Sequence, residues 1–288
     1  MTDIDVSATP AATTTAGRLP PASRSTSLNL SRLPTLQVYS ALAFLFLFLP
    51  VLMLVALSFN ANATGIFPLS GFTLDWYREA FQNKIIWPAL RNSAIVAFFT
   101  AVVAAALGTP AAFGLTRYNF RFKNLLRGML VVPMSLPTLL IGIALLSFFA
   151  FLSIPRSLIT VIIGHVVYTV PYMVLVVGAR LAEFDFTVEE AAQDLGATPL
   201  QTFNMITFPL IRPSIIGAML LIFAQSFDMF VITFFNIGAQ STLPMVIWSM
   251  MRRGINPSLN ALGTMVMAFS ILLLFLANRF GGMKLGAQ

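Results

Sequence analysis

The 288-residue sequence lacks cysteine altogether and contains a single histidine. Disulfides, thiolate metal sites and cysteine nucleophiles are therefore excluded, and little remains that can ligate a transition metal. A glycine-rich phosphate loop of the Walker type is also missing, so the chain is not expected to bind ATP itself. No metal and no cofactor are predicted.

Charged residues are also scarce in this sequence. Only 9% of the residues are charged and 58% are hydrophobic, whereas an ordinary soluble domain has about 25% charged residues. A soluble fold of this size cannot hide so much apolar surface, so the surroundings are predicted to be lipid. The net charge of +7 does not indicate nucleic-acid binding, because the basic residues stand singly between long apolar runs.

Long apolar runs fill most of the chain, and six of them reach the roughly 20 residues that a helix needs to cross a bilayer. The predicted membrane helices are 33–59, 94–115, 128–154, 157–179, 213–236 and 257–278. Internal prolines are tolerated in such helices as kinks. Because no segment alternates as a β-barrel strand would, the predicted fold is an all-α integral membrane protein with six transmembrane helices.

The first run has a competing interpretation as a secretory signal peptide, because Ala61-Asn62-Ala63 resembles a cleavage site. A signal core spans only about 7–15 residues and begins soon after the first methionine, so an uncleaved helix at 33–59 is favoured. Residues 1–32 are rich in Ala, Thr, Ser and Pro without apolar periodicity. They are predicted to form a disordered tail.

Membrane orientation follows from the distribution of lysine and arginine. With the N-terminus inside, most basic residues fall in cytoplasmic segments, and the short loop 117–127 alone holds four of them. By the positive-inside rule both termini are predicted to be cytoplasmic, including the short tail 280–288. The tryptophans (Trp76, Trp87, Trp248) then fall outside, near helix ends, where aromatic side chains favour the interface.

Residues 180–212 form a polar cytoplasmic loop that is rich in helix signals. Thr187 is expected to cap a helix whose third residue, Glu190, reaches back to it. Gly196 stands where a left-handed C-terminal cap is needed. The polar residues of this helix are predicted to face outward: Glu189, Gln193 and Asp194.

A second helix signal follows at once. Thr198 and Gln201 repeat the capping pattern around a proline at the first helical position, and Pro209 and Pro213 are taken as the boundary with the next span. The loop is thus predicted to contain two short helices, 187–195 and 199–208. From these residues alone it is either a linker folded onto its own helix ends or a docking platform for a partner.

Three of its motifs occur at the spacing of a known signature. Glu190-Ala191-Ala192, then Gly196, then Ile206-Thr207-Phe208-Pro209 resembles the EAA loop of ABC-importer permeases, in which E-A-A is followed by G and I-x-L-P. Phe208 replaces the preferred leucine. The resemblance extends over about 91–279 and implies a type I ABC-importer permease core with five of the six helices. It implies that these loop residues couple to an ATPase: Glu189, Glu190, Ala191, Ala192, Asp194, Gly196, Phe203, Ile206 and Pro209.

The resemblance also implies partners. In that family a coupling helix inserts into a groove of a separate cytoplasmic ATPase subunit, so the chain is expected to be a transporter subunit and not an enzyme. A dimer of that ATPase, a second permease subunit (expected to be a paralogue) and a periplasmic solute-binding protein would complete the importer. The expected location is the bacterial inner membrane, with residues 60–90 as a periplasmic loop and no nucleic acid involved.

Three further segments narrow the resemblance. Residues 225–228, 243–250 and 256–261 look like those of spermidine/putrescine-type permeases, which implies a polyamine or similar amine as the solute. Permeases for iron, sulfate, phosphonates or opine-like solutes are similar and remain alternatives. A self-contained secondary transporter is less favoured, because it would place several ionisable residues in its spans. An intramembrane enzyme would need a nucleophile or metal set, which the sequence does not supply.

Asp228 is an acidic residue in the middle of a run, where a charge costs about 2.5–3.5 kcal/mol on insertion scales. It either lines the translocation pathway with Gln225 or is a buried carboxylate bonded to neighbouring helix ends. His165, Tyr168 and Tyr172 share one helix face. They either offer hydrogen bonds and ring faces to an amine or pack between helices. All five are candidate pathway residues.

The segment after the fifth run contains a predicted short helix at 244–253, ended by Gly254. Asn256 and Pro257 look like the cap and first residue of the sixth run. Arg252 and Arg253 at the end of this helix either contact the solute-binding protein or anchor the chain at the interface.

Overall fold

The computed structural model describes residues 34–62, 68–183, 185–254 and 257–281. Within these ranges the chain is helical apart from connecting turns and an isolated β-bridge between Asn60 and Phe72, which confirms the all-α prediction. The predicted N-terminal tail, the cap at Asn256 and residues 282–288 of the second tail lie outside the described residues.

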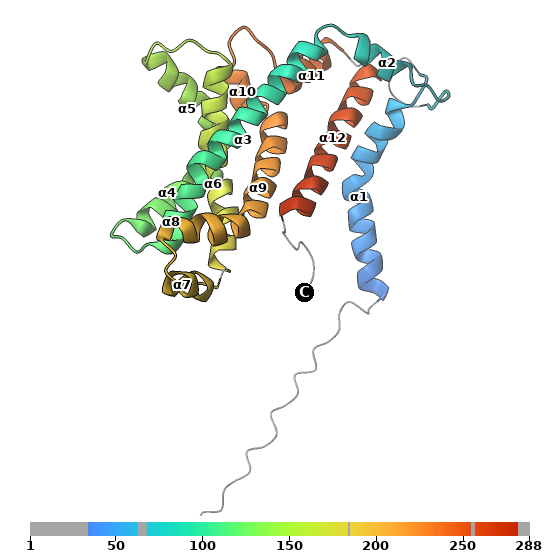
Figure 1. Ribbon diagram of the computed structural model, residues 1–288. Helices are drawn as coiled ribbons and strands as arrows, with labels where there is room; N and C mark the ends of the chain where they lie inside the picture. Colours follow the sequence, from blue (N-terminus) through green and yellow to red (C-terminus); the bar gives the residue numbers. More distant parts are fainter. Residues whose placement is uncertain (1–33, 63–67, 184, 255–256, 282–288) are drawn as a thin grey trace, which may run out of the picture. The chain divides into compact units, whose positions relative to one another are not determined.

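The chain divides between Leu49 and Pro50 into two compact units, and the packing of helices α2 to α12 belongs to the second (Figure 1). The helices are α1 (Pro34–Ser58), α2 (Asp75–Gln82), α3 (Ile86–Arg117), α4 (Lys123–Ser135), α5 (Thr138–Phe151), α6 (Leu158–Ala182), α7 (Thr187–Asp194), α8 (Pro199–Thr202), the π-helix η2 (Phe203–Thr207), α9 (Phe208–Asp228), α10 (Val231–Asn236), α11 (Leu243–Arg253) and α12 (Pro257–Gly281).

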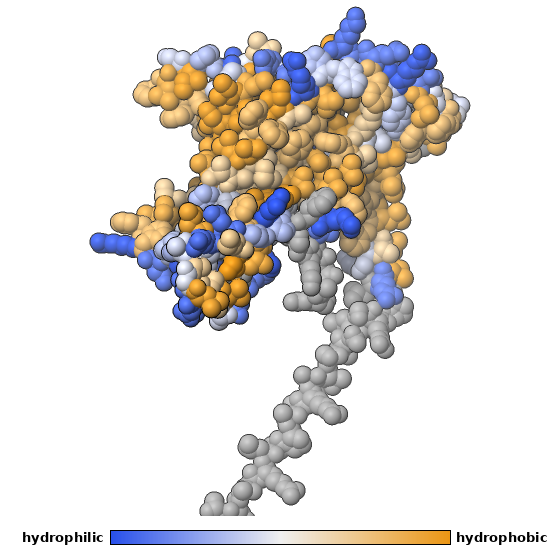
Figure 2. Space-filling view, viewed as in Figure 1, coloured by the Kyte–Doolittle hydropathy of each residue, from blue (hydrophilic) through white to orange (hydrophobic). Residues whose placement is uncertain are grey.

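Among the described residues, five helical stretches are long and apolar enough to cross a membrane, and there are six if the bent pair α4 and α5 counts as one span. Four of the predicted spans correspond to single helices: α1, α3, α6 and α12. On the face in Figure 2, hydrophobic side chains cover the middle of the second unit, whereas polar ones gather around α7 and α8 at one end and around α2 and α11 at the other.

The prediction of one helix over 128–154 is wrong. The chain breaks at Leu136 and Pro137, and α4 and α5 are bent by 104° relative to each other. A proline disfavours helical geometry in the residue before it, and Leu136 is indeed extended, with φ −85° and ψ 141°. Pro133 lies inside α4 without ending it, so the two prolines act differently.

The fifth run is also divided differently from the prediction. Its helix starts at Pro199 and continues to Asp228, so 199–208 is not a separate short helix. Pro209 does not end it, because a π turn precedes this proline: the Phe208 N–H bonds the carbonyl of Phe203. Pro209 is then the second residue of α9, where no helical N–H partner is required. At the other end, Met229 is extended and α10 begins only at Val231.

Small residues bring α3 close to its neighbours α6 and α9 (Figure 1). In membranes such residues let helix backbones approach, because lipid provides no hydrophobic drive for association. At Gly108 an added Cβ would lie 2.7 Å from Cβ and Cγ of Met173 on α6. The buried stripe on α3 consists of Ala97, Ala101, Ala104, Gly108 and Ala112.

We expect Gly108→Ala to destabilise the protein by about 1–3 kcal/mol, the usual cost of overpacking a core. Gly114→Ala on the same helix is the matched control, because an added Cβ there meets nothing within 4 Å and alanine favours helix by up to about 1 kcal/mol. Thermal unfolding in detergent measures both. Equal midpoints for the two variants would contradict the close contact between α3 and α6.

Candidate functional site

The docking loop, defined here as residues 185–208, begins with a cap that differs from the predicted one. Thr187 is the first residue of α7, not its cap, and its backbone N–H donates to Oδ1 of Asp185 at 3.0 Å. This hydrogen bond lowers the pKa of the exposed Asp185 carboxyl below its ordinary value. A carboxylate at a helix N-terminus also suits the helix dipole.

The corner between α7 and α8 is built as predicted. Gly196 has φ +88°, a conformation that a side chain disfavours. Its N–H bonds the carbonyl of Gln193 at 2.9 Å, and the next N–H, of Ala197, bonds that of Ala192 at 3.0 Å. These two bonds form a Schellman motif.

The predicted cap of the second helix is also confirmed. The Gln201 N–H donates to Oγ1 of Thr198 at 3.3 Å, and the Thr198 N–H donates to Oε1 of Gln201 at 2.8 Å. Pro199 occupies the first helical position. The direction in which the chain leaves the Gly196 corner is therefore fixed by local hydrogen bonds.

The prediction that Glu189 faces outward is wrong. Its Oε1 atom accepts a hydrogen bond from Nη2 of Arg117 at 2.7 Å and another from the hydroxyl of Thr207. The Glu189 side chain is only 15% exposed and that of Arg117 only 10%. Position on the helix face alone could not predict this, because the attraction comes from a cation at the end of α3. Gln193 and Asp194 are exposed, as predicted.

The other residues that the EAA resemblance singles out divide into two groups. Exposed in this chain are Glu190, Ala191, Asp194, Gly196 and Pro209; half-buried are Ala192, Phe203 and Ile206. The ring of Phe203 packs at right angles against that of Phe113 on α3, with centroids 5.7 Å apart.

The loop also exposes large apolar side chains. Leu195 is 90% exposed, Met205 77% and Leu200 69%, and exposed apolar side chains that gather in one segment are typical of interaction sites. The arrangement can accommodate a partner surface of mixed apolar and basic character, because Glu190 and Asp194 are exposed nearby on α7.

Asp228 lies at the point where the fifth span breaks. It is the last residue of α9, and its Oδ2 accepts a hydrogen bond from the hydroxyl of Ser270 on α12 at 2.9 Å. The residue lines a cavity of about 230 Å³ together with Phe230 and Trp248, whose ring centroids are 5.6 Å apart. Gln225 is half-buried about one turn earlier. An acidic group and aromatic faces therefore share one cavity.

His165 is fully buried between helices. Its Nδ1 atom is 2.7 Å from Oγ of Ser226 on α9, and its Nε2 atom is 2.9 Å from Oγ1 of Thr233 on α10. The other two members of the predicted face, Tyr168 and Tyr172, are half-buried, with hydroxyls 3.4 Å apart. The predicted face is thus divided between a buried network and a tyrosine pair.

A second set of hydrogen bonds is centred on Asn236, the last residue of α10. The Asn236 side-chain amide donates to the carbonyl of Gly142 on α5 at 3.2 Å, and the Thr160 hydroxyl on α6 donates to the Asn236 carbonyl at 2.7 Å. The sequence signal for these hydrogen bonds is the presence of polar residues, Thr160 and Asn236, within otherwise apolar runs. These hydrogen bonds tie α10 to α5 and α6.

The short helix after the fifth run is α11, and Gly254 at its end has φ +130°, which confirms the predicted termination. Arg252 and Arg253 are both exposed. The guanidinium of Arg252 lies 4.9 Å from the Trp248 ring centroid, and Nε of Arg253 donates to the Ser249 carbonyl. The two cations thus lie on the helix that carries the tryptophan of the Asp228 cavity.

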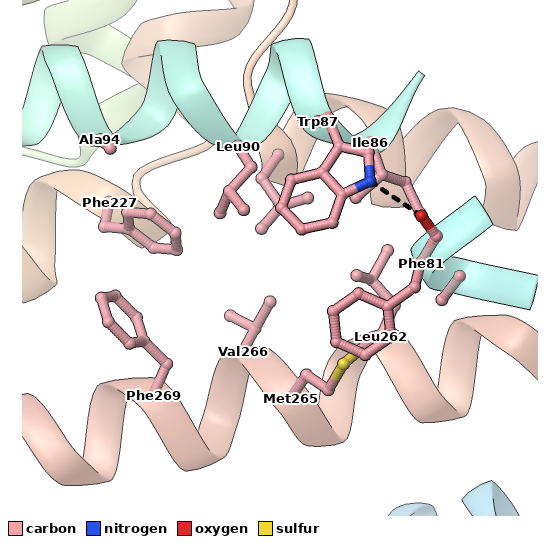
Figure 3. Close-up of a pocket in the computed structure, with 12 residues that line it drawn as sticks. Phe81, Ile86, Trp87, Leu90, Ala94, Phe227, Leu262, Met265, Val266 and Phe269 are labelled. Atoms are coloured by element: carbon pink, nitrogen blue, oxygen red, sulfur yellow. Dashed lines mark hydrogen bonds between the residues drawn. The ribbon is translucent and has the colours of Figure 1, made fainter. Parts of the chain in front are cut away.

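A second cavity, of about 350 Å³, lies among α2, α3, α9, α11 and α12 and has an apolar lining (Figure 3). Phe227 and Phe269 point toward each other across it, with ring centroids 5.2 Å apart. The Trp87 indole N–H donates to the Phe81 carbonyl at 2.8 Å at its edge. None of the described residues that line this cavity is charged, unlike the cavity at Asp228.

We expect His165→Leu to lower stability by about 2 kcal/mol or more, since buried groups that lose a partner cost about 1–3 kcal/mol each. Tyr168→Phe, which removes only one hydroxyl of the half-buried pair, is expected to leave the unfolding midpoint nearly unchanged. Thermal unfolding in detergent compares the two. An unchanged midpoint for His165→Leu would contradict a structural role for the network.

Comparisons with known proteins bear on the whole chain. The family model described as the binding-protein-dependent transport system inner membrane component matches residues 104–282. The putrescine transport system permease protein PotI of Escherichia coli (strain K12) is 38% identical over 248 residues, covering 83% of this chain and 88% of that protein. The spermidine/putrescine transport system permease protein PotC of Haemophilus influenzae is 32% identical over 249 residues, covering 86% and 96%.

Solved structures show the same fold. A bacterial ABC transporter involved in the import of the acidic polysaccharide alginate has a chain with a TM-score of 0.67 and 13% identity, covering 88% of this chain and 95% of that one. The MetNI methionine ABC transporter in an inward-facing conformation gives a TM-score of 0.58 with 18% identity, covering 69% and 95%. The EAA-loop resemblance is confirmed: this chain belongs to the binding-protein-dependent transport system inner membrane components, a family of multi-pass permeases.

Proposed function

We propose that this chain is one permease subunit of an ATP-driven importer for putrescine, spermidine or a chemically similar amine. The observation that carries the proposal is its identity of 38% and 32% with two permeases named for polyamine transport, over most of both chains. Importers of other solutes share the fold, as the alginate and methionine transporters do, so fold alone supports no particular solute.

The cavity at Asp228 supports a cationic solute. A carboxylate attracts an ammonium group, and the faces of Trp248 and Phe230 offer cation–π contacts. Because α9 ends at Asp228, the negative end of its dipole adds to the attraction. Discontinuous membrane helices commonly place such ends at transport sites. The proposed pathway in this chain includes Asp228, with Gln225 on the turn before it.

The docking loop is the proposed contact for the ATPase. Its exposed apolar residues Leu195, Leu200 and Met205 can enter a groove, and the exposed carboxylates of Glu190 and Asp194 can pair with basic groups at its edge. For this contact to form, the loop lies in the cytoplasm, and we expect both termini on the same side. A second permease, proposed to be a paralogue, completes the pathway.

The opposite end of the second unit is the proposed contact for a periplasmic solute-binding protein. It carries α2 and α11 (Figure 1), and the exposed Arg252 and Arg253 lie on α11. Since Trp248 on the same helix lines the Asp228 cavity, a solute released here would lie close to the carboxylate.

The function is tested by coexpressing the chain with candidate ATPase, second-permease and binding-protein subunits and measuring the uptake of labelled putrescine and spermidine in proteoliposomes. We expect saturable uptake that requires ATP and the binding protein. Uptake without ATP would contradict the importer assignment. Uptake of an anionic or neutral solute in place of both polyamines would contradict the solute.

We expect Asp228→Asn to raise the uptake Km for a polyamine about tenfold, which is the effect of losing roughly 1.4 kcal/mol of charge attraction. Ser270→Ala is the matched control, because it removes the hydrogen bond to Asp228 but leaves the carboxylate charge. If both variants change Km equally, or neither does, Asp228 is not a binding group of the pathway.

We expect Leu200→Glu to abolish copurification of the ATPase, because a charge on this 69% exposed apolar side chain would have to be desolvated in the groove. Leu200→Met, which keeps an apolar side chain of similar volume, is expected to retain it. Pull-down from detergent extracts followed by quantification of the ATPase measures both. Full recovery with Leu200→Glu would contradict docking through α8.

A further inference from the structure

Two parts of the docking loop and the end of α3 meet at one carboxylate oxygen. Oε1 of Glu189 on α7 accepts hydrogen bonds from Nη2 of Arg117, the last residue of α3, and from the hydroxyl of Thr207, the last residue of η2. Arg117, Glu189 and Thr207 are called the Glu189 clamp below. In the sequence, Glu189 is 72 residues from Arg117 and 18 residues from Thr207.

The clamp is shielded from water, which separates it from an ordinary surface ion pair. Thr207 is 2% exposed, and the side chains of Arg117 and Glu189 are 10% and 15% exposed. The nearby pair of Arg180 and Glu183 is longer, at 3.5 Å, with side chains 44% and 72% exposed. Exposed ion pairs contribute little to stability. Removing one member of a shielded pair is destabilising, because it leaves a charge without a partner.

Arg117 is held from a second direction. Its guanidinium lies 4.0 Å from the ring centroid of Phe186, the residue before α7, and 5.5 Å from that of Phe113 on α3. A cation at the C-terminus of α3 also suits the negative end of that helix. One arginine thus contacts the ring of the residue before α7 and the carboxylate of a residue in the first turn of α7.

Apolar packing does not hold α7 in place, since none of its side chains is buried. Glu189 and the small side chain of Ala192 are its half-buried members, and Val188 on the same turn as Glu189 is 48% exposed. The position of α7 against α3 therefore depends on polar contacts. The third arm of the clamp reaches Thr207, directly before α9 begins at Phe208.

We propose that the Glu189 clamp makes α3, α7 and the start of α9 move as one body when the docking loop is displaced. Arg117 and Glu189 are then positioning residues for coupling, and Glu189 acts within this chain instead of across the ATPase interface. The proposal rests on the proposed function, because it concerns how force on the loop reaches the membrane helices.

The test compares solute transported per ATP hydrolysed in the reconstituted complex. We expect Glu189→Ala to lower this ratio at least fivefold while the ATPase copurifies at wild-type amounts and still hydrolyses ATP. Glu189→Gln, which keeps an oxygen for the Thr207 hydroxyl, is expected to give an intermediate ratio. Glu183→Gln, at the exposed pair, is expected to leave the ratio unchanged. Monodisperse elution in detergent shows that each variant is folded.

A double-mutant cycle identifies the clamp as one unit. Coupled residues show non-additive effects, so Arg117→Gln combined with Glu189→Gln is expected to lower the ratio no further than the stronger single variant. Arg117→Lys, which keeps the charge, is expected to retain more coupling than Arg117→Gln. Additive effects would overturn the clamp.

Other outcomes separate the clamp from the function on which it rests. A wild-type ratio for Glu189→Ala, or loss of ATPase copurification by that variant, overturns the clamp alone, because the second result would make Glu189 an interface contact. A wild-type complex that neither binds an ATPase nor moves a polyamine overturns the proposed function, and the clamp with it.

Discussion

Lipid offers no hydrogen-bond partners, so a membrane chain that breaks a helix must satisfy the freed polar groups itself. This chain breaks its fifth span after Asp228 and its third at Leu136. The network of His165, Ser226 and Thr233 lies beside the break that follows Asp228. Its hydrogen bonds join α6, α9 and α10. A broken span that presents Asp228 to a cavity is possible because this network supports the segment that follows it.

The same constraint explains which parts of the sequence could be predicted. Long apolar runs identify α1, α3, α6 and α12, because a span needs only length and hydrophobicity. The corner at Gly196 and the cap at Thr198 depend only on residues that are close in sequence, so they could also be predicted. The effect of a single proline is harder to predict. Pro209 follows a π turn and the helix continues through it, whereas the chain bends by 104° at Pro137.

The candidate site was less predictable than the fold, because its decisive contacts are long-range. Helix periodicity placed Glu189 on the outer face of α7, but a shielded cation 72 residues earlier in the chain binds it instead. The spacing of His165 and Tyr168 likewise suggested one shared face, whereas only the histidine meets hydroxyls from α9 and α10. Local patterns reveal which residues share an element and leave open what that element packs against.

The continuity of the helix from Pro199 to Asp228 connects the two ends of the proposed function. Its 30 residues correspond to about 45 Å at about 1.5 Å per residue. Residues 199–208 at one end of this helix belong to the docking loop, and the acidic cavity lies at the other end. A separate second loop helix would need a further contact to transmit displacement toward Asp228. In a continuous helix the backbone hydrogen bonds serve that purpose, and the proposed clamp contacts this helix at Thr207.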